Sequence, residues 1–189
     1  MFAHTHRIIS QHINNNIKSH LGIELNINSL VYGSIEPDIK PSLAKLAHFK
    51  PDTFDQICEE IDHLSQYRLT TNEAFIKFLS RKIGITTHFI SDYFCVPHND
   101  RQKYKHNFLA HVKYEQQLHR LFKKFDKSIH LDSFIEVCQS PDFAIKNYLE
   151  DFHKEYTNRG ESLENDLQSA ITASSAVAIF IITNESLLD

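Results

Sequence analysis

Apolar residues recur every three or four positions along most of the chain, as expected for amphipathic helices with one buried face. In the first such segment, from about Thr5 to Leu21, Ile9, Ile13 and Ile17 lie on one stripe. Only four glycines and five prolines interrupt the chain. Alternating runs of β-branched residues, which would indicate strands, are few. The pattern therefore predicts an all-α fold.

Further helices are expected where the same spacing returns between loop-forming residues. Thr70-Thr-Asn-Glu73 forms a capping box, which indicates a firm helix start. The last segment, rich in alanine, isoleucine and other apolar residues, is predicted to be a buried central helix. The expected helices after the first cover about residues 52–67, 73–95, 100–125, 131–138, 141–158 and 162–183, with a shorter apolar segment over 25–32.

Two local features bear on the candidate ligands. The stretch from Gly33 to Pro41 contains two prolines within five residues and is predicted to be an irregular loop that holds Asp38 rigidly. His48 is expected in another loop. Gly84 stands one helical turn before His88, where its missing side chain would leave room beside a ligand. Alternatively, Gly84 is a tolerated mid-helix glycine that costs about 1 kcal/mol.

The overall composition excludes several classes of protein. A length of 189 residues predicts a single helical domain over 1–189. The formal net charge of −4 argues against a nucleic-acid partner, because such binding neutralises phosphates with lysine and arginine. Three cysteines without a CxxC pair indicate neither a disulfide framework nor a cysteine-rich zinc site. No secretory signal is visible, and the longest apolar run, Ala176 to Ile182, is too short for a transmembrane segment. We therefore expect a cytoplasmic location.

The chemistry-bearing residues concentrate between His88 and Glu115. His88 and Asp92 stand four positions apart, as do His111 and Glu115, and His98 lies between the two pairs. Residues at i and i+4 share one helix face, so each pair can bind one ion. Imidazole together with carboxylate suits zinc, although iron and manganese also accept these ligands. We therefore expect a multinuclear metal site.

These motifs, taken in order, resemble the zinc-dependent bacterial phospholipases C, in particular their compact, all-helical members. The resemblance begins at Thr5-His6-x-Ile-Ile. It continues through Gly33-Ser-Ile-Glu-Pro-Asp38-Ile and His48, and then through Gly84-x3-His88-x3-Asp92-x5-His98. It ends at His111-x3-Glu115. The resemblance implies a single-domain, multi-helix bundle of the type found in that family.

The same resemblance implies two or three zinc ions. His48, His88 and Asp92 would hold one ion, with Asp38 as a further ligand or as the base for the attacking water. His98, His111 and Glu115 would hold a second. In exported family members, an N-terminal tryptophan binds the third ion through its amino group and carbonyl. This chain has no tryptophan, so the third ion would rely on Asp92 with His6, and His4 is an alternative to His6.

The expected function is hydrolysis of a phosphate ester by metal-activated water, with a phospholipid as the implied substrate. Two other classes stay open. One is a ferritin-like di-iron protein, because Glu60-x-x-His63 and Glu150-x-x-His153 have the ExxH spacing of such bundles. The other is a metal-stabilised protein without catalytic activity. The sequence alone leaves the physiological substrate and the oligomeric state undetermined.

Overall fold

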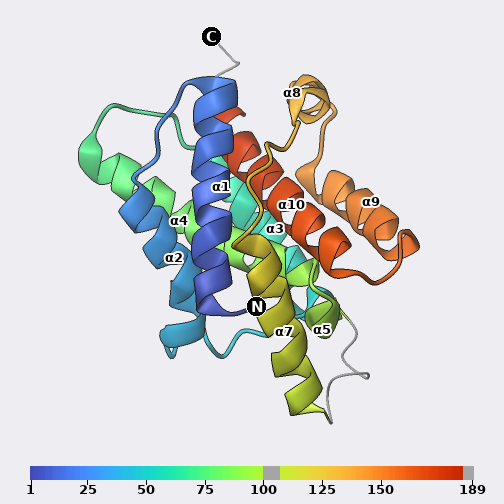
Figure 1. The fold of residues 1–189 in the computed structure, drawn as a ribbon. Helices are drawn as coiled ribbons and strands as arrows, with labels where there is room; N and C mark the ends of the chain where they lie inside the picture. Colours follow the sequence, from blue (N-terminus) through green and yellow to red (C-terminus); the bar gives the residue numbers. More distant parts are fainter. Residues whose placement is uncertain (100–106, 185–189) are drawn as a thin grey trace.

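The computed structural model describes residues 1–99 and 107–184. These residues form nine helices and no strand, which confirms the all-α prediction (Figure 1). The helices are α1 (Ala3–Leu21), α2 (Ile27–Ile39), α3 (Lys50–Ser65), α4 (Glu73–Tyr93), α5 (Val96–Asn99), α7 (Phe108–Phe122), α8 (Asp132–Cys138), α9 (Ile145–Asn158) and α10 (Leu163–Thr183).

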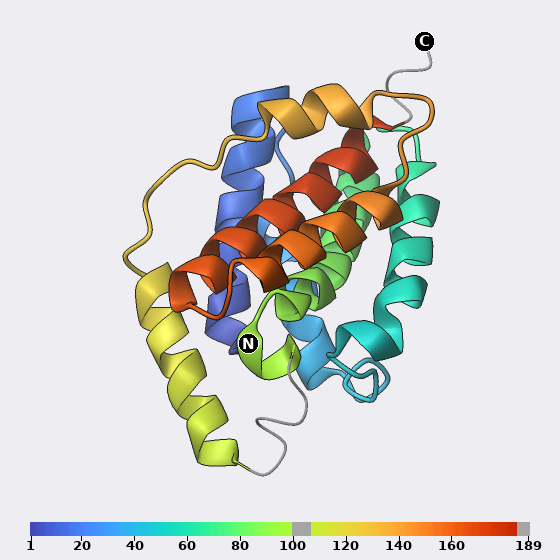
Figure 2. The ribbon, with the colours of Figure 1, turned by 90° about the vertical axis from the view of Figure 1, so that its right-hand side faces the viewer.

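Helix α10 occupies the centre of the bundle. It contacts α1, α3, α4, α7, α8 and α9, and Figure 2 shows it running between them. Its length and composition would allow it to cross a membrane, yet 83% of the relevant window is buried inside the fold. A buried core helix can have the same length and apolar composition as a membrane-spanning one. The prediction of a buried central helix is therefore confirmed by its burial.

The backbones of helices α2 and α4 lie in close contact where the two helices cross. A Cβ atom added to Gly84 would overlap the carbonyl oxygen of Leu30 and lie 2.8 Å from the Ser34 nitrogen. A Cβ atom added to Gly33 would likewise overlap the backbone of Arg81. Gly84 therefore admits the α2 backbone, rather than leaving room for a ligand or merely being tolerated. This crossing lies about one turn from the ligand-bearing residues of both helices.

The predicted loop from Gly33 to Pro41 is wrong in its first part, because α2 remains helical to Ile39 with Pro37 inside it. A proline in a helix removes one backbone hydrogen bond. Packing against α4 compensates, since buried Glu36 accepts a hydrogen bond from Arg81 Nε at 2.7 Å. Asp38 therefore stands on the last helical turn of α2.

Several predicted helix ends differ from the structure. Asn72, rather than Thr70, caps α4 by accepting a hydrogen bond from the Phe75 nitrogen. Helix α4 ends at Tyr93, two residues before the predicted end at residue 95, and Pro97 lies within the short helix α5. Helix α9 begins four residues after the predicted Pro141 start. The first part of the helix predicted over 100–125 lies outside the described residues.

Candidate metal centre

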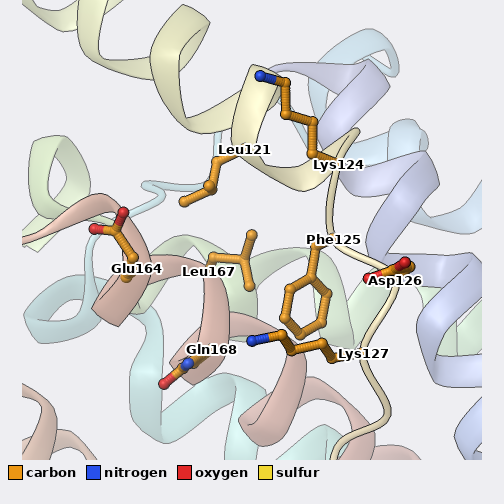
Figure 3. Close-up of a pocket in the computed structure, with 8 residues that line it drawn as sticks. All are labelled: Leu121, Lys124, Phe125, Asp126, Lys127, Glu164, Leu167 and Gln168. Atoms are coloured by element: carbon orange, nitrogen blue, oxygen red, sulfur yellow. The ribbon is translucent and has the colours of Figure 1, made fainter.

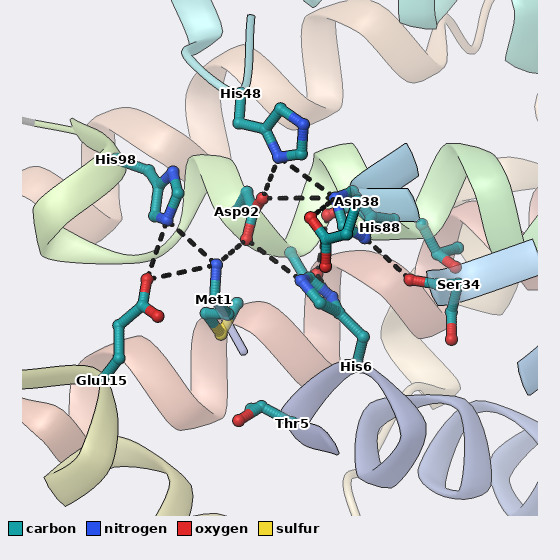
Figure 4. A network of polar contacts seen from close by, with 12 residues as sticks. Met1, Thr5, His6, Ser34, Asp38, His48, His88, Asp92, His98 and Glu115 are labelled. Atoms are coloured by element: carbon teal, nitrogen blue, oxygen red, sulfur yellow. Dashed lines mark hydrogen bonds and ion pairs between the residues drawn. The ribbon is translucent and has the colours of Figure 1, made fainter. Parts of the chain in front are cut away.

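All eight predicted ligands lie together at one end of the bundle, and Figure 4 labels each of them except His111. They come from five helices and one loop that are far apart in the sequence. The ligand atoms form three groups, each with its atoms within 4.8 Å of one another. The groups are His6, His88 and Asp92; Asp38, His48 and His88; and His98, His111 and Glu115.

The first two groups meet on α4. His88 belongs to both of them, and its Nε2 atom lies 3.5 Å from Asp92 Oδ2 and 3.7 Å from Asp38 Oδ1. His48 Nδ1 lies 2.8 Å from Asp92 Oδ2 and 3.1 Å from His88 Nε2. The residues that the resemblance assigns to two ions thus share one continuous cluster.

The third group joins α5 to α7. Glu115 Oε1 lies 2.8 Å from His111 Nε2 and 3.0 Å from His98 Nε2. The i and i+4 spacing of His111 and Glu115 on α7 brings their side chains together, as the sequence predicted. Both imidazoles thus point at one carboxylate.

The α-amino group of Met1 lies between the third group and Asp92. It donates to Asp92 Oδ1 at 2.6 Å and lies 2.9 Å from His98 Nε2 and 3.4 Å from Glu115 Oε1. Burial alone would lower the pKa of this amine, but Asp92 and Glu115 raise it to about 11. These acceptors therefore surround a cation, and the chemistry of this position favours positive charge.

Hydrogen bonds orient two of the imidazoles toward the cluster. The ring nitrogen Nδ1 of His88 lies 2.7 Å from the Ser34 carbonyl oxygen, which can only accept, so Nδ1 carries the proton. Ser91 Oγ donates to the His88 carbonyl oxygen at 2.8 Å and therefore accepts from His6 Nδ1, 3.1 Å away. In both residues, the Nε2 lone pair is left for a ligand.

The Nε2 atom of His6 supplies a test of whether a metal fits. It is buried and has no hydrogen-bond partner among the described residues. An unpaired buried polar atom is costly unless something satisfies it. A lone pair held among an imidazole and a carboxylate suits a borderline metal ion such as zinc. The residues present therefore fit a zinc cluster.

Charge within the cluster also suits metal ligands. Burial, followed by the nearby His6, lowers the pKa of His88 well below its usual value, which keeps the ring neutral. Burial acts to raise the pKa of Asp92, but the Met1 amine and neighbouring imidazoles hold that pKa well below its usual range. Burial also acts to raise the pKa of Glu115, but hydrogen bonds from His111 and His98 lower it. Neutral imidazole and ionised carboxylate are the forms that bind metals.

Asp38 differs from the other two carboxylates of the cluster. Its side chain is 29% exposed, whereas that of Asp92 is 0% exposed and that of Glu115 is 7% exposed. Burial raises the pKa of Asp38. Asp38 is therefore the carboxylate of the cluster that a substrate or solvent can reach most easily.

A buried carboxylate outside the ligand groups, Asp166, holds together the segments that carry the third group. Its side chain accepts hydrogen bonds from the Val96 nitrogen at 2.9 Å, from Tyr114 Oη at 2.9 Å and from Tyr156 Oη at 2.8 Å. Val96 begins α5, which carries His98, and Tyr114 adjoins Glu115 on α7. Burial raises the pKa of Asp166 to about 6. Asp166 at the start of α10 therefore fixes the position of α5 relative to α7.

We expect Asp166→Ala to weaken zinc binding as well as the fold. The change removes the acceptor of two buried donors, the Val96 nitrogen and Tyr156 Oη. A buried donor left without an acceptor costs about 1–3 kcal/mol. Asp166 contacts no ligand directly, so the fall in zinc affinity should stay below the loss of about 10- to 100-fold that removal of a ligand's direct outer partner causes. Zinc titration and thermal unfolding would measure both effects. Asp166→Asn keeps one acceptor oxygen and should lose less of each. A lower unfolding temperature with unchanged zinc affinity would limit Asp166 to a structural role.

The residues of the rival di-iron prediction have other partners. Glu60 pairs with Lys82 at 2.7 Å, and His153 Nε2 lies 3.1 Å from the Tyr93 carbonyl oxygen. None of the three ligand groups found among the described residues contains Glu60, His63, Glu150 or His153. His4 is exposed, with its ring 6.3 Å from that of His119. The structure thus brings His6, and not His4, into the cluster.

A pocket of about 240 Å³ lies beyond the far end of α7 (Figure 3). It is lined by Leu121, Lys124, Phe125, Asp126, Lys127, Glu164, Leu167 and Gln168. None of these residues belongs to the ligand groups, so the pocket is separate from the metal centre.

Sequence reasoning missed the groups that support the ligands. Ser34 and Ser91 orient His88 and His6, and Asp166 holds α5 and α7. A buried Asp166 had a weak signal, since an acidic residue opens an otherwise apolar segment. That residue could equally have been a helix-capping side chain in solvent.

Comparison with known families gives one match. A family model described as zinc dependent phospholipase C matches residues 5–163, a range that contains all eight predicted ligands. Searches of curated proteins and of solved structures find no match.

Proposed function

The chain belongs to the zinc-dependent phospholipase C family, and on this basis we propose that it hydrolyses a phosphodiester, with a phospholipid head-group bond as the substrate bond. The observation that carries the proposal is the cluster itself. Eight imidazoles and carboxylates from distant segments converge on one site, and the buried Nε2 atom of His6 has no hydrogen-bond partner within the described chain.

In this proposal, His6, His48, His88 and Asp92 hold one part of a cluster of two or three zinc ions, and His98, His111 and Glu115 hold the other. Zinc in such a cluster lowers the pKa of a bound water and neutralises charge on the phosphoryl oxygens. His88 and His6 bind through the Nε2 atoms that their Nδ1 hydrogen bonds to Ser34 and Ser91 leave free. These fixed second partners orient the ligands before substrate arrives.

Asp38 has the role of general base. Asp92 is fully buried and enclosed by the Met1 amine and imidazoles, and Glu115 is hydrogen-bonded by two histidines. Asp38 stands at the edge of the cluster, with Oδ1 3.7 Å from His88 Nε2 and its side chain partly exposed. One carboxylate oxygen can therefore accept a proton from water while α2 holds the residue in place.

Metal analysis and a hydrolysis assay test the proposal. Purified protein is expected to contain two or three zinc ions per chain and to hydrolyse a chromogenic phosphocholine ester. Asp38→Asn should retain metal and lose about 100-fold or more of the activity, the range typical of a general base. Asp151→Asn, at an exposed carboxylate paired with Lys154, serves as the control and should change neither property.

Each contrary result points to a different conclusion. Absence of any stoichiometric transition metal would remove the basis of the proposal. Bound iron with an oxo-bridge absorption would favour a di-iron protein. Bound zinc without hydrolysis of any phosphodiester would indicate a metal-binding protein without this activity.

A further inference from the structure

The most exposed large apolar side chains of the described residues lie beside the metal centre. Leu109 is 80% exposed, Phe108 is 75% exposed and Ile39 is 60% exposed. The next value is 54%, for Val137 on the distant helix α8. Single exposed apolar residues are ordinary, but a set gathered around one site indicates a contact surface.

These three side chains come from two helices that also carry ligands of the cluster. Ile39 directly follows Asp38 at the end of α2, and Phe108 and Leu109 form the start of α7, within one turn of His111. Figures 1 and 2 show the end of α2 and the start of α7 on the same side of the bundle, with the N-terminus between them. A planar partner that touches both elements would therefore cover the metal centre.

The same rim is basic, although the chain as a whole has a formal charge of −4. Residues 38–52 contain Lys40, Lys45 and Lys50 against Asp38 and Asp52, and residues 107–114 contain Lys113 and no acidic residue, so lysines outnumber carboxylates there. Glu36 contacts Lys40 at 3.1 Å but also pairs with Arg81, so one carboxylate is shared by two cations. Exposed apolar side chains among lysines are the combination that binds anionic lipid surfaces.

We propose that this lipid-facing rim, formed by Ile39, Lys40, Lys45, Phe108, Leu109 and Lys113, docks on an anionic phospholipid surface. Its apolar side chains enter the boundary of the acyl region, and its lysines lie at the head-group phosphates. A second copy of the chain is a poorer partner, because a symmetric contact would place the lysines against one another. The biological meaning of the contact rests on the proposed hydrolase function, but docking itself requires no hydrolysis.

Vesicle co-sedimentation of the purified full chain tests the proposal. Vesicles of phosphatidylcholine are compared with vesicles that also contain phosphatidylglycerol. We expect about tenfold or stronger partition onto the anionic vesicles, and this difference should fall as salt screens the lysines. Asp38→Asn should bind at least as strongly, because it removes a carboxylate beside the rim, and this separates docking from turnover.

Variants of the rim identify the surface. The double change Phe108→Ser and Leu109→Ser should reduce partition about tenfold or more, because two side chains that would enter the lipid become polar. The double change Lys45→Glu and Lys113→Glu should remove the preference for anionic vesicles. Val137→Ser, also at an exposed apolar position, is the matched control and should bind as the parent does.

Three outcomes would overturn the proposal. These are equal sedimentation with both vesicle types, no sedimentation with either, or unchanged partition of the Phe108 and Leu109 double variant. A dimer in ultracentrifugation that this double variant dissociates, without vesicle binding, would assign the rim to a second copy. The soluble chromogenic ester keeps the two proposals apart. Its hydrolysis without vesicle binding would reject only the docking surface, and vesicle binding without any hydrolysis would reject only the enzymatic function.

Discussion

Asp92→Asn is expected to lose at least one zinc ion per chain and more than about 100-fold of the hydrolytic activity. Loss of an outer-sphere partner alone costs about 10- to 100-fold in metal affinity or activity, and Asp92 lies inside the cluster. Its two oxygens contact the Met1 amine at 2.6 Å and His48 at 2.8 Å, and Oδ1 lies 3.4 Å from His6. An asparagine keeps the shape but brings no negative charge to these groups.

The same change should destabilise the metal-free protein. In that state the buried Met1 ammonium would retain only Glu115, at 3.4 Å, as a carboxylate partner. Removal of one member of a buried ion pair costs about 3–5 kcal/mol, which corresponds to a fall of about 6 °C or more in Tm for a chain of this size. Zinc content, ester hydrolysis and thermal unfolding with and without chelator would measure these effects.

Asp151→Asn again provides the matched control, because its carboxylate is exposed and pairs only at the surface with Lys154. Its effect should stay within about 0.5 kcal/mol. If Asp92→Asn kept the full zinc content and activity of the parent, Asp92 would not be a ligand, and the cluster would need another arrangement.

Gly84→Ala has the second large expected effect, and its sign is informative. Alanine is a better helix former than glycine by about 1 kcal/mol, so a glycine that is merely tolerated would give a more stable variant. The added Cβ atom instead meets the backbone of Leu30 and Ser34 on α2, which cannot rotate away as a side chain could. Overpacking of this kind costs about 1–3 kcal/mol or more. We therefore expect a lower Tm.

Activity should fall more than stability in this variant. The added atom pushes α2 away from α4 about one turn from Asp38 and His88, the pair whose relative position matters for the proposed reaction. A displacement of about 1 Å can cost about 100-fold in rate. Hydrolysis per bound zinc, measured below the unfolding transition, would report this loss.

Gly22→Ala is the matched comparison, because it strains the backbone but brings the added Cβ atom against no neighbouring atom. Gly22 has a φ of 67°, and nothing lies within 4 Å of an added Cβ atom. Its left-handed backbone costs an alanine about 1–2 kcal/mol, so stability should fall with zinc content and activity unchanged. If Gly84→Ala matched or exceeded the parent in both stability and activity, the close crossing would not constrain the site.

The sequence could predict the residues of the candidate site where two ligands stand four positions apart on one helix. His88 with Asp92 and His111 with Glu115 each share a helix face, and that relation needs only the helical period. Asp38, His48 and His6 are distant in sequence, and no periodicity links them to α4. The family resemblance was needed to group them, and the structure brings all three to the cluster.

The remaining features depend on contacts that no local pattern encodes. The propensity of proline predicted a loop around Pro37, but the packing of Glu36 and Gly33 against α4 extends the helix to Ile39. The acceptor role of Asp166 depends on α5, α7 and α9 meeting at the start of α10. Contacts between distant helices depend on the tertiary arrangement, so composition and local spacing could not predict them.

The central position of α10 has a consequence for how the protein is made. Its partners α1, α3, α4, α7, α8 and α9 all precede it in the sequence, so each leaves the ribosome before the helix that fills their common core. Contacts across so long a sequence separation also form slowly. Until residues 163–183 emerge, the faces of the earlier helices that pack on α10 are uncovered and favour aggregation. The helices that carry the candidate metal ligands should therefore reach their final packing only after residues 163–183 have emerged.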